Sequence, residues 1–355
     1  MDLDRRSLLT TGLTAAAIGG TAALLPSPAD AALRTKVLAT GLKVPWGLAF
    51  LPNGDALTGE RNTGSVFRIF ARGGRRRIGE VTGLVSGESE GGLLGLALSP
   101  RFKKDRWVYA YISTNSDNRI VRMRYADGKL GRKHVLLAGI PDGAHHDGGR
   151  LLFAPDGTLL ATAGDATMDR AHSKARNLKS LAGKILRLTP DGEVPDDNPF
   201  KGKYVWTYGH RNPQGLAYDR KGRLWGCEFG LNKRDELNRI VKGDDYGWPK
   251  YEGGDGSGPV HDPFVTWHPS ECSPSGLAIT RGRAWVGALR GQALWSVVLD
   301  GPHRKKKARH LHGKFGRIRS VALAPDGSLW LTTSNRDGRV TPVATDDRVI
   351  RVRFP

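Results

Sequence analysis

The chain has 355 residues, of which 39% are hydrophobic and 8% aromatic. This composition supplies a packed core and excludes a disordered chain. The formal net charge is +20, which suits nucleic-acid binding, but no known nucleic-acid motif accompanies the basic runs at 72–77 and 304–309. We therefore interpret these runs as solvated basic faces and expect no nucleic-acid partner.

The N-terminus has the features of an export signal. Paired arginines at 5–6 precede an apolar stretch at 8–25, and small residues at 29–31 offer a cleavage site. Twin arginines favour the Tat route over the Sec route. The stretch is weak as a permanent anchor, and no other segment is long and apolar enough to span a membrane. We predict an export signal at 1–31 and one domain at 32–355, in the periplasm, secreted or at the cell surface.

One pattern recurs six times along the rest of the chain. A short apolar strand led by a small residue is followed by a turn rich in Pro, Asp and Gly, and then by a second apolar strand. The copies are roughly 45 to 65 residues apart, close to the period of propeller blades with four short strands. Turn residues between two β-type runs predict a hairpin in each copy. The copies begin at Gly47, Gly95, Gly149, Gly215, Gly276 and Ser320.

The repeats are expected to close into a ring, because one blade alone cannot bury both of its faces. The last strand, at 348–354, is expected to pair with the chain that follows Leu33. Helical segments are scarce, and 171–182 fits a short helix or a loop equally well. We therefore predict an all-β fold, a six-bladed β-propeller of four-stranded blades, with a pair of β-sandwiches as the alternative.

Two cysteines, Cys227 and Cys272, are present. In an exported protein they either form one disulfide or remain two buried thiols. Both lie near loops that we place on the channel side of adjacent blades, which could bring them together. Neither alternative is preferred from the residues alone.

The loops that enter the inner strands carry side chains suited to catalysis. His146 precedes one inner strand, and Asp165 follows the neighbouring strand. Such an Asp can fix the tautomer of the imidazole and raise its basicity, as a general base requires; the alternative is a histidine that only caps the strand. In the next such loop Arg211 and Asn212 can together hold a carbonyl or an oxyanion, or they only close the turn.

Two further groups of residues suggest ion binding. Acidic and Gly-rich segments at 228–236 and 244–249 offer oxygens of the kind that calcium prefers, although a solvated acidic loop has the same composition. Arg317 and Arg319 lie on one side of a strand by alternation. With Arg290 they suit a planar polycarboxylate, which matches the fork geometry of guanidinium groups. The alternative is salt bridging to carboxylates such as Asp346 or Asp347.

These motifs resemble those of the soluble quinoprotein sugar dehydrogenases, the glucose/sorbosone and aldose sugar dehydrogenase group. The resemblance implies a six-bladed propeller with pyrroloquinoline quinone (PQQ) lying flat over the channel. It also implies oxidation of an aldose at its anomeric carbon to the lactone, with an external electron acceptor. The resemblance runs from about Leu38 to the C-terminus, and its motifs are Tyr208-Gly-His-Arg-Asn-Pro-Gln-Gly-Leu216, Asp235-Glu236-Leu-Asn238, Tyr246-Gly-Trp-Pro249, Gly91-Gly-Leu-Leu-Gly95 and His146-x-x-Gly149-Arg150-Leu151.

Carried over residue by residue, the resemblance implies roles for individual side chains. His146 looks like the base that takes the proton of the anomeric hydroxyl, with Asp165 as its orienting partner. Arg211 and Asn212 resemble the pair that holds the reactive carbonyl of the quinone. Trp267 resembles an aromatic residue that covers the quinone ring.

The same resemblance implies the ionic contacts. The residues that look like partners of the quinone's carboxylates are Arg290, Arg317 and Arg319. The carbonyls of Gly230 and Leu231 look like ligands of the calcium that polarises the quinone. The carbonyls of Glu236 and Tyr246 look like ligands of a further, structural calcium.

One departure from the family concerns Glu90, which stands where the family has a Gln that touches the quinone. A carboxylate near an anionic cofactor is unfavourable unless it is protonated or paired, and we expect it to pair with Arg211. The alternative function is a non-redox propeller that binds carbohydrate or a protein partner at the cell surface. A calcium-dependent lactonase is a weaker alternative, because few carboxylates are placed to line the channel.

Overall fold

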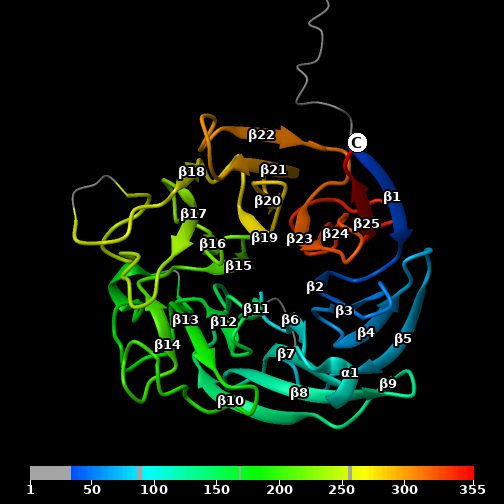
Figure 1. Ribbon diagram of the computed structural model, residues 1–355, viewed down its shortest axis with the longest axis horizontal. Coiled ribbons are helices and arrows are strands. Elements are labelled where there is room, and N and C mark those ends of the chain that lie inside the picture. The colour runs from blue at the N-terminus through cyan, green and yellow to red at the C-terminus, as the bar shows by residue number, and fades with distance from the viewer. Residues whose placement is uncertain (1–32, 86–89, 168, 255–257) are drawn as a thin grey trace, which may run out of the picture.

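The computed structural model describes residues 33–85, 90–167, 169–254 and 258–355. The predicted export signal at 1–31 lies outside these residues. Six antiparallel sheets are arranged around a central axis as the blades of a propeller (Figure 1). Five of the sheets have four strands, and the second has a short fifth strand. The predicted six-bladed propeller is confirmed.

The first three blades follow the order of the chain. Blade 1 consists of β2 (Pro45–Phe50), β3 (Ala56–Glu60), β4 (Ser65–Ile69) and β5 (Arg75–Glu80). Blade 2 consists of β6 (Leu93–Leu98), β7 (Trp107–Ser113), β8 (Asn118–Ala126), β9 (Lys129–Leu130) and β10 (His134–Ile140). Blade 3 consists of β11 (Leu151–Phe153), β12 (Leu159–Ala163), β13 (Lys184–Leu188) and β14 (Val205–Tyr208).

The last three blades continue this pattern, except that the sixth takes its outer strand from the start of the chain. Blade 4 consists of β15 (Pro213–Tyr218), β16 (Leu224–Glu228), β17 (Asp235–Ile240) and β18 (Val265–Trp267). Blade 5 consists of β19 (Pro274–Thr280), β20 (Arg283–Ala288), β21 (Ala293–Val298) and β22 (Lys307–His310). Blade 6 consists of β23 (Ile318–Leu323), β24 (Leu329–Thr333), β25 (Val349–Arg353) and β1 (Arg34–Ala39).

The ring closes as the sequence predicts. β1 pairs with β25 in antiparallel register, with Arg34 opposite Arg353, and in Figure 1 the blue strand lies beside the red one. Helical structure within the described residues is limited to α1 (Phe102–Asp105) and a 3₁₀ turn at Arg170–His172. The segment at 171–182 is therefore mostly loop. No helix in the described part of the chain has the length and apolar character needed to cross a membrane.

The repeated glycines explain how the inner strands fit around the axis. A Cβ atom on Gly47 would lie 2.6 Å from the backbone nitrogen of Leu96, and one on Gly276 would lie 2.2 Å from that of Val321. Neighbouring inner strands thus touch backbone to backbone, and a side chain at these positions would separate them. The small residue that leads each repeat is required by this close approach.

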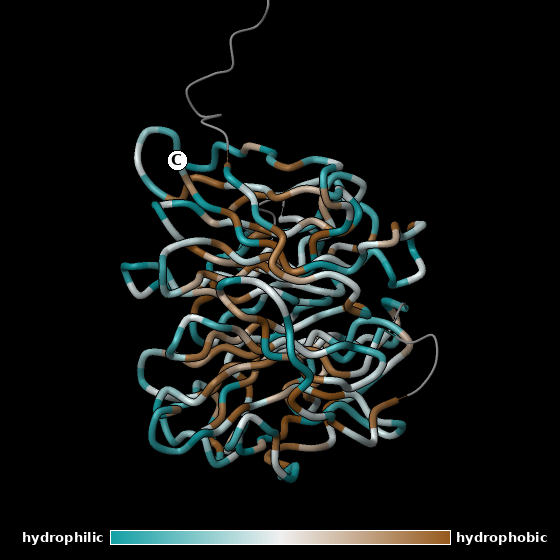
Figure 2. Tube along the Cα trace, turned by 90° about the vertical axis from the view of Figure 1, so that its right-hand side faces the viewer, coloured by the Kyte–Doolittle hydropathy of each residue, from teal (hydrophilic) through white to brown (hydrophobic). Residues whose placement is uncertain are grey.

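Apolar side chains fill the space between every pair of neighbouring blades. Leu57 of blade 1 packs in one cluster with Val108 of blade 2, and Leu160 of blade 3 packs in another with Leu216 of blade 4. Similar clusters lie at the remaining four interfaces, including the one between blades 6 and 1. Figure 2 shows hydrophobic residues gathered along the interior strands and hydrophilic ones on the outer loops. The core therefore holds the blades to one another.

The two cysteines lie in the core cluster between blades 4 and 5. Cys227 and Cys272 are both fully buried free thiols, so the disulfide alternative is wrong and the buried-thiol alternative is correct. Burial raises the pKa of both thiols. The sulfur of Cys227 contacts the carbonyl oxygen of Ser275 at 3.5 Å, and the thiols act as small apolar core residues.

Candidate active site

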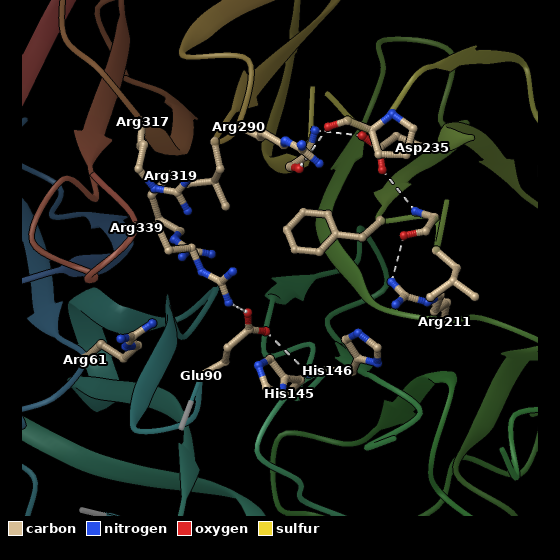
Figure 3. Close-up of a pocket in the computed structure, with 16 residues that line it drawn as sticks. Arg61, Glu90, His145, His146, Arg211, Asp235, Arg290, Arg317, Arg319 and Arg339 are labelled. Atoms are coloured by element: carbon tan, nitrogen blue, oxygen red, sulfur yellow. Dashed lines mark hydrogen bonds and ion pairs between the residues drawn. The ribbon is translucent and has the colours of Figure 1, made fainter. Parts of the chain in front are cut away.

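A cavity of about 580 Å³ lies on the face of the ring where inner strands begin and second strands end, a volume typical of small-molecule sites. Segments just before inner strands supply Glu90, His146 and Arg211 to its wall, and segments just after second strands supply Arg61 and Arg290. Figure 3 shows these side chains converging from different blades. The residues predicted from the sequence that line this cavity are Glu90, His146, Arg211, Gly230, Leu231, Arg290, Arg317 and Arg319.

His146 and Asp165 form the pair that the sequence predicts. The ring nitrogen Nδ1 of His146 lies 2.8 Å from Oδ1 of Asp165 and 2.6 Å from the carbonyl oxygen of Thr167. Both partners are acceptors, so Nδ1 carries the proton and Nε2 is left with its lone pair free to accept one. Asp165 itself lies behind His146 and does not line the cavity. The arrangement is that of an oriented general base.

The backbone at His146 adopts a positive φ of 67°, which is uncommon for a residue with a side chain. The carbonyl group of His146 packs closely against Gly164, where a Cβ atom would lie 1.8 Å from its oxygen. Strained residues of this kind cluster at functional sites, which agrees with a role for this histidine.

Arg211 and Asn212 lie side by side in sequence but face different surroundings. Arg211 lines the cavity, donates from Nη1 to the carbonyl oxygen of Gly230 at 2.8 Å, and has no partner for its buried Nε among the described residues. Burial lowers the pKa of Arg211. Asn212 is fully buried below the cavity, where its Oδ1 accepts the N–H of Gly148 at 3.0 Å, and its Nδ2 finds no acceptor in the described chain. Asn212 thus tethers the His146 loop and keeps one donor unused.

Arginines give the lining of the cavity an excess of positive charge. Six arginines and two carboxylates, Glu90 and Asp235, line it. Arg317 donates from Nη2 to Asp337 at 2.9 Å, and Arg319 approaches the same oxygen at 3.7 Å. Burial, with the charges of Arg61 and Arg317 beside it, lowers the pKa of Arg319 to about 9. An anion between these groups would offset this effect.

The carboxylates that pair with these arginines are not the ones named in the sequence analysis. The carboxylate that pairs with Arg317 is Asp337. Asp346 instead pairs with Arg348 at 2.8 Å, and Asp347 accepts backbone N–H groups of Val44 and Asn335. Both of these carboxylates serve to hold the loop that leads into β25.

Glu90 pairs with Arg339, so the predicted partner, Arg211, is wrong. Oε1 of Glu90 lies 2.7 Å from Nη2 of Arg339, whereas Arg211 points to Gly230. Burial alone would raise the pKa of Glu90, but the charges of Arg339 and Arg319 hold it below its usual value. Glu90 is therefore an ionised carboxylate whose charge is neutralised within the cavity wall.

The prediction for Trp267 is also wrong. It ends β18, the outermost strand of blade 4, and only 1% of its surface is exposed. Its ring packs against Trp295, with 6.1 Å between the ring centroids. Because an outermost strand lies far from the axis, this indole belongs to the core between blades 4 and 5 and not to the cavity.

The four carbonyls predicted to bind calcium fall into two neighbouring places. Gly230 and Leu231 line the main cavity, whereas Glu236 and Tyr246 line an adjoining small cavity of about 10 Å³. The side chains of Glu228 and Glu252 also line the small cavity. Burial and the charge of Glu228 raise the pKa of Glu236 to about 8. The described residues show no ready-made group of three or more metal-binding side chains.

Arg61, His145 and Arg339 line the cavity but were missed by the sequence analysis, and Asp235 was named there only as part of a motif, without a place in the cavity wall. Arg61 follows β3 as Arg290 follows β20, so the repeat itself contained a positional signal for it. Arg339 lies in the long loop between β24 and β25, where no repeat position marks it.

Comparison with known proteins identifies the family of this chain. The family described as Glucose / Sorbosone dehydrogenase matches residues 42–342. The PQQ-bound aldose sugar dehydrogenase of Streptomyces coelicolor is 46% identical, with a TM-score of 0.85 over 90% of this chain and 98% of that chain. The aldose sugar dehydrogenase YliI of Escherichia coli is 29% identical over 89% of this chain and 94% of its own. Quinoprotein glucose dehydrogenase B of Acinetobacter calcoaceticus is 34% identical over 61% of this chain and 52% of its own. The chain therefore belongs to the glucose/sorbosone dehydrogenase family of oxidoreductases.

Proposed function

We propose that this protein oxidises an aldose sugar at its anomeric carbon to the lactone, with PQQ and calcium as cofactors and an external electron acceptor. The observation that carries the proposal is the oriented base His146 in the wall of an arginine-rich cavity. The predicted export signal at 1–31 would place this chemistry outside the cytoplasm, after passage through the Tat route.

The cavity suits a flat, polyanionic quinone. Arg290, Arg317 and Arg319 provide cationic groups for carboxylates. Arg211 and Arg319 line the cavity, and their buried Nε atoms have no acceptor within the described structure. Buried donors without a partner are costly, and the carbonyl and carboxylate oxygens of PQQ would satisfy them.

The residues around Gly230 suit calcium by the chemistry of their oxygens. The main-chain oxygens of Gly230 and Leu231 would face the cofactor, and those of Glu236 and Tyr246 would hold a second ion beside buried carboxylates. Burial, together with the nearby charge of Glu228, raises the pKa of Glu236, and a divalent cation bound beside these carboxyl groups would favour their ionised forms. Since calcium and a guanidinium repel each other, metal binding at Gly230 is expected to displace Arg211 from that carbonyl.

In the proposed reaction Nε2 of His146 takes the proton of the anomeric hydroxyl. Asp165 steadies the imidazolium that forms, because its Oδ1 faces the protonated Nδ1. When bound, PQQ would supply the acceptor for the hydride of the anomeric carbon, and a calcium held by the carbonyls of Gly230 and Leu231 would polarise it. Arg211, with Asn212 beneath it, would stabilise the negative charge that builds at the reactive carbonyl of the quinone as the hydride arrives. Loss of the proton and the hydride would convert the sugar to the lactone.

A titration of the purified apoprotein with PQQ and calcium tests the proposal. We expect a saturable cofactor spectrum and sugar-dependent reduction of a dye. His146→Ala should retain the spectrum and lose a factor of about 10²–10⁴ in turnover. The absence of saturable PQQ binding would instead favour the non-redox binding propeller. A lactonase is disfavoured, because Glu90 and Asp235 are the carboxylates among the described lining residues and Glu90 is paired.

A further inference from the structure

The indole of Trp248 contacts both Asp165, the partner of the proposed base, and Arg211. It is 4% exposed, and its Nε1–H donates to Oδ2 of Asp165 at 2.5 Å. The other oxygen of Asp165 faces His146 at 2.8 Å. Each carboxylate oxygen thus has its own partner, the base on one side and the indole on the other.

The face of the same indole lies next to guanidinium groups. Cζ of Arg211 lies 5.3 Å from the ring centroid of Trp248, and Cζ of Arg170 lies 4.7 Å from it. Cations over an indole are attracted by its ring electrons. The backbone N–H of Trp248 also donates to the carbonyl oxygen of Gly209 at 2.8 Å, which ties the indole to the loop that carries Arg211.

We propose that Trp248 is a positioning residue that orients Asp165 toward His146 and supports Arg211 with the face of its ring. A carboxylate can turn about its bond to Cβ, and a hydrogen bond to Oδ2 restrains that turn so that Oδ1 stays at Nδ1 of His146. The part that His146 plays in turnover rests on the proposed function. The contact between Trp248 and Asp165 is a property of the chain itself and can be tested without cofactor.

Trp248→Phe separates positioning from packing, because it keeps an aromatic ring and removes the N–H. Loss of a supporting partner typically costs 10–100-fold, so we expect kcat to fall about 10-fold, KM for the sugar to change little, and the pH profile of kcat/KM to shift. A residue that only packs would lower the melting temperature and leave the pH profile unchanged.

Trp225 supplies a matched control in the same blade. Its Nε1 donates to Oδ2 of Asp219 at 3.0 Å, and Cζ of Arg223 lies 5.4 Å from its ring centroid. Asp219 lies in the turn between β15 and β16, at the end of these strands opposite to Arg211. Trp225→Phe therefore removes the same kind of hydrogen bond, and we expect it to leave kcat and the pH profile as in the wild type.

A second measurement uses the apoprotein with ¹⁵N-labelled histidine and tryptophan. The Nδ1 signal of His146, assigned with His146→Ala, should move in Trp248→Phe and stay in place in Trp225→Phe. The Asp165→Asn variant retains Trp248, and its indole N–H signal should differ in position from that of the wild type. This comparison keeps the test available if Trp248→Phe does not fold.

The proposal would be overturned if the His146 signal were unchanged in Trp248→Phe, or if the indole signal of Trp248 did not move in Asp165→Asn. A Trp248→Phe protein with wild-type kcat and pH profile would overturn it too. Failure of the proposed function has a different signature, because the wild-type protein would then show no PQQ-dependent oxidation while the apoprotein signals still report on the contact.

Discussion

Asp147→Asn is expected to make the protein more stable at neutral pH. Asp147 follows the proposed base, is 3% exposed, and accepts from Nδ2 of Asn118 at 3.0 Å through Oδ1. Its Oδ2 is buried with no partner in the described part of the chain. Burial raises the pKa of Asp147 from 3.8 to about 6, so the folded protein holds this proton more tightly than the unfolded chain does.

The sign of the pH dependence follows from linkage. Because the pKa is raised on folding, the contribution of Asp147 to stability is fully present below about pH 3.8 and is lost as the pH rises through about 6. The difference of about 2 pKa units corresponds to about 3 kcal/mol. An Asn at this position keeps the oxygen that faces Asn118 and cannot ionise. The variant therefore does not lose this stability as the pH rises.

Parallel unfolding measurements between pH 4 and pH 8 test this magnitude. We expect the stability of Asp147→Asn relative to the wild type to rise by up to about 3 kcal/mol across this range. Asp142→Asn removes a half-buried carboxylate from the same loop and should give a much smaller change. A difference between Asp147→Asn and wild type that stays flat with pH would refute the reasoning.

Three further predictions concern the cavity, the metal and the thiols. Glu90→Gln removes a carboxylate from a site for an anionic cofactor and frees Arg339. The Kd for PQQ should therefore fall or stay the same, and its pH dependence near the Glu titration should flatten. A large rise in Kd would mean that Glu90 makes an essential contact. Treatment with EDTA should lower both turnover and Tm, because an ion bound only to the folded state stabilises it by mass action, and the calcium sites fail if neither quantity changes. A thiol reagent should find no reactive group in the native protein, since Cys227 and Cys272 are buried, and two after denaturation without reductant; fewer than two would indicate a disulfide.

The fold was predictable because its requirements repeat along the chain. The close approach of inner strands requires a residue without a side chain at Gly47 and Gly276. Glycines at 95, 149 and 215 are crowded as well, and the sixth repeat has the small residue Ser320 at this position. The turn residues between paired strands repeat with this position. The pairing of His146 with Asp165 was predictable for a related reason, because both positions are defined by where an inner strand begins and the next strand ends.

Other features depend on tertiary packing that the linear pattern does not contain. The partner of Glu90 is Arg339, which lies in an irregular loop of blade 6. The tryptophan that supports the site is Trp248 and not Trp267, since the latter lies on an outermost strand. Composition shows that tryptophans are present, but their distance from the axis depends on how each blade is wound.

The pairing of β1 with β25 has a consequence for biosynthesis. Sixth-blade residues such as Arg317 and Arg339 complete a cavity whose other walls come from blades 1 to 5. Among the described strands, the one that locks blade 6 into the ring is made first, and its partner at Val349–Arg353 is made last. A growing chain that has not yet reached β25 therefore has no closed ring, so the proposed chemistry requires that this strand has been made and paired with β1.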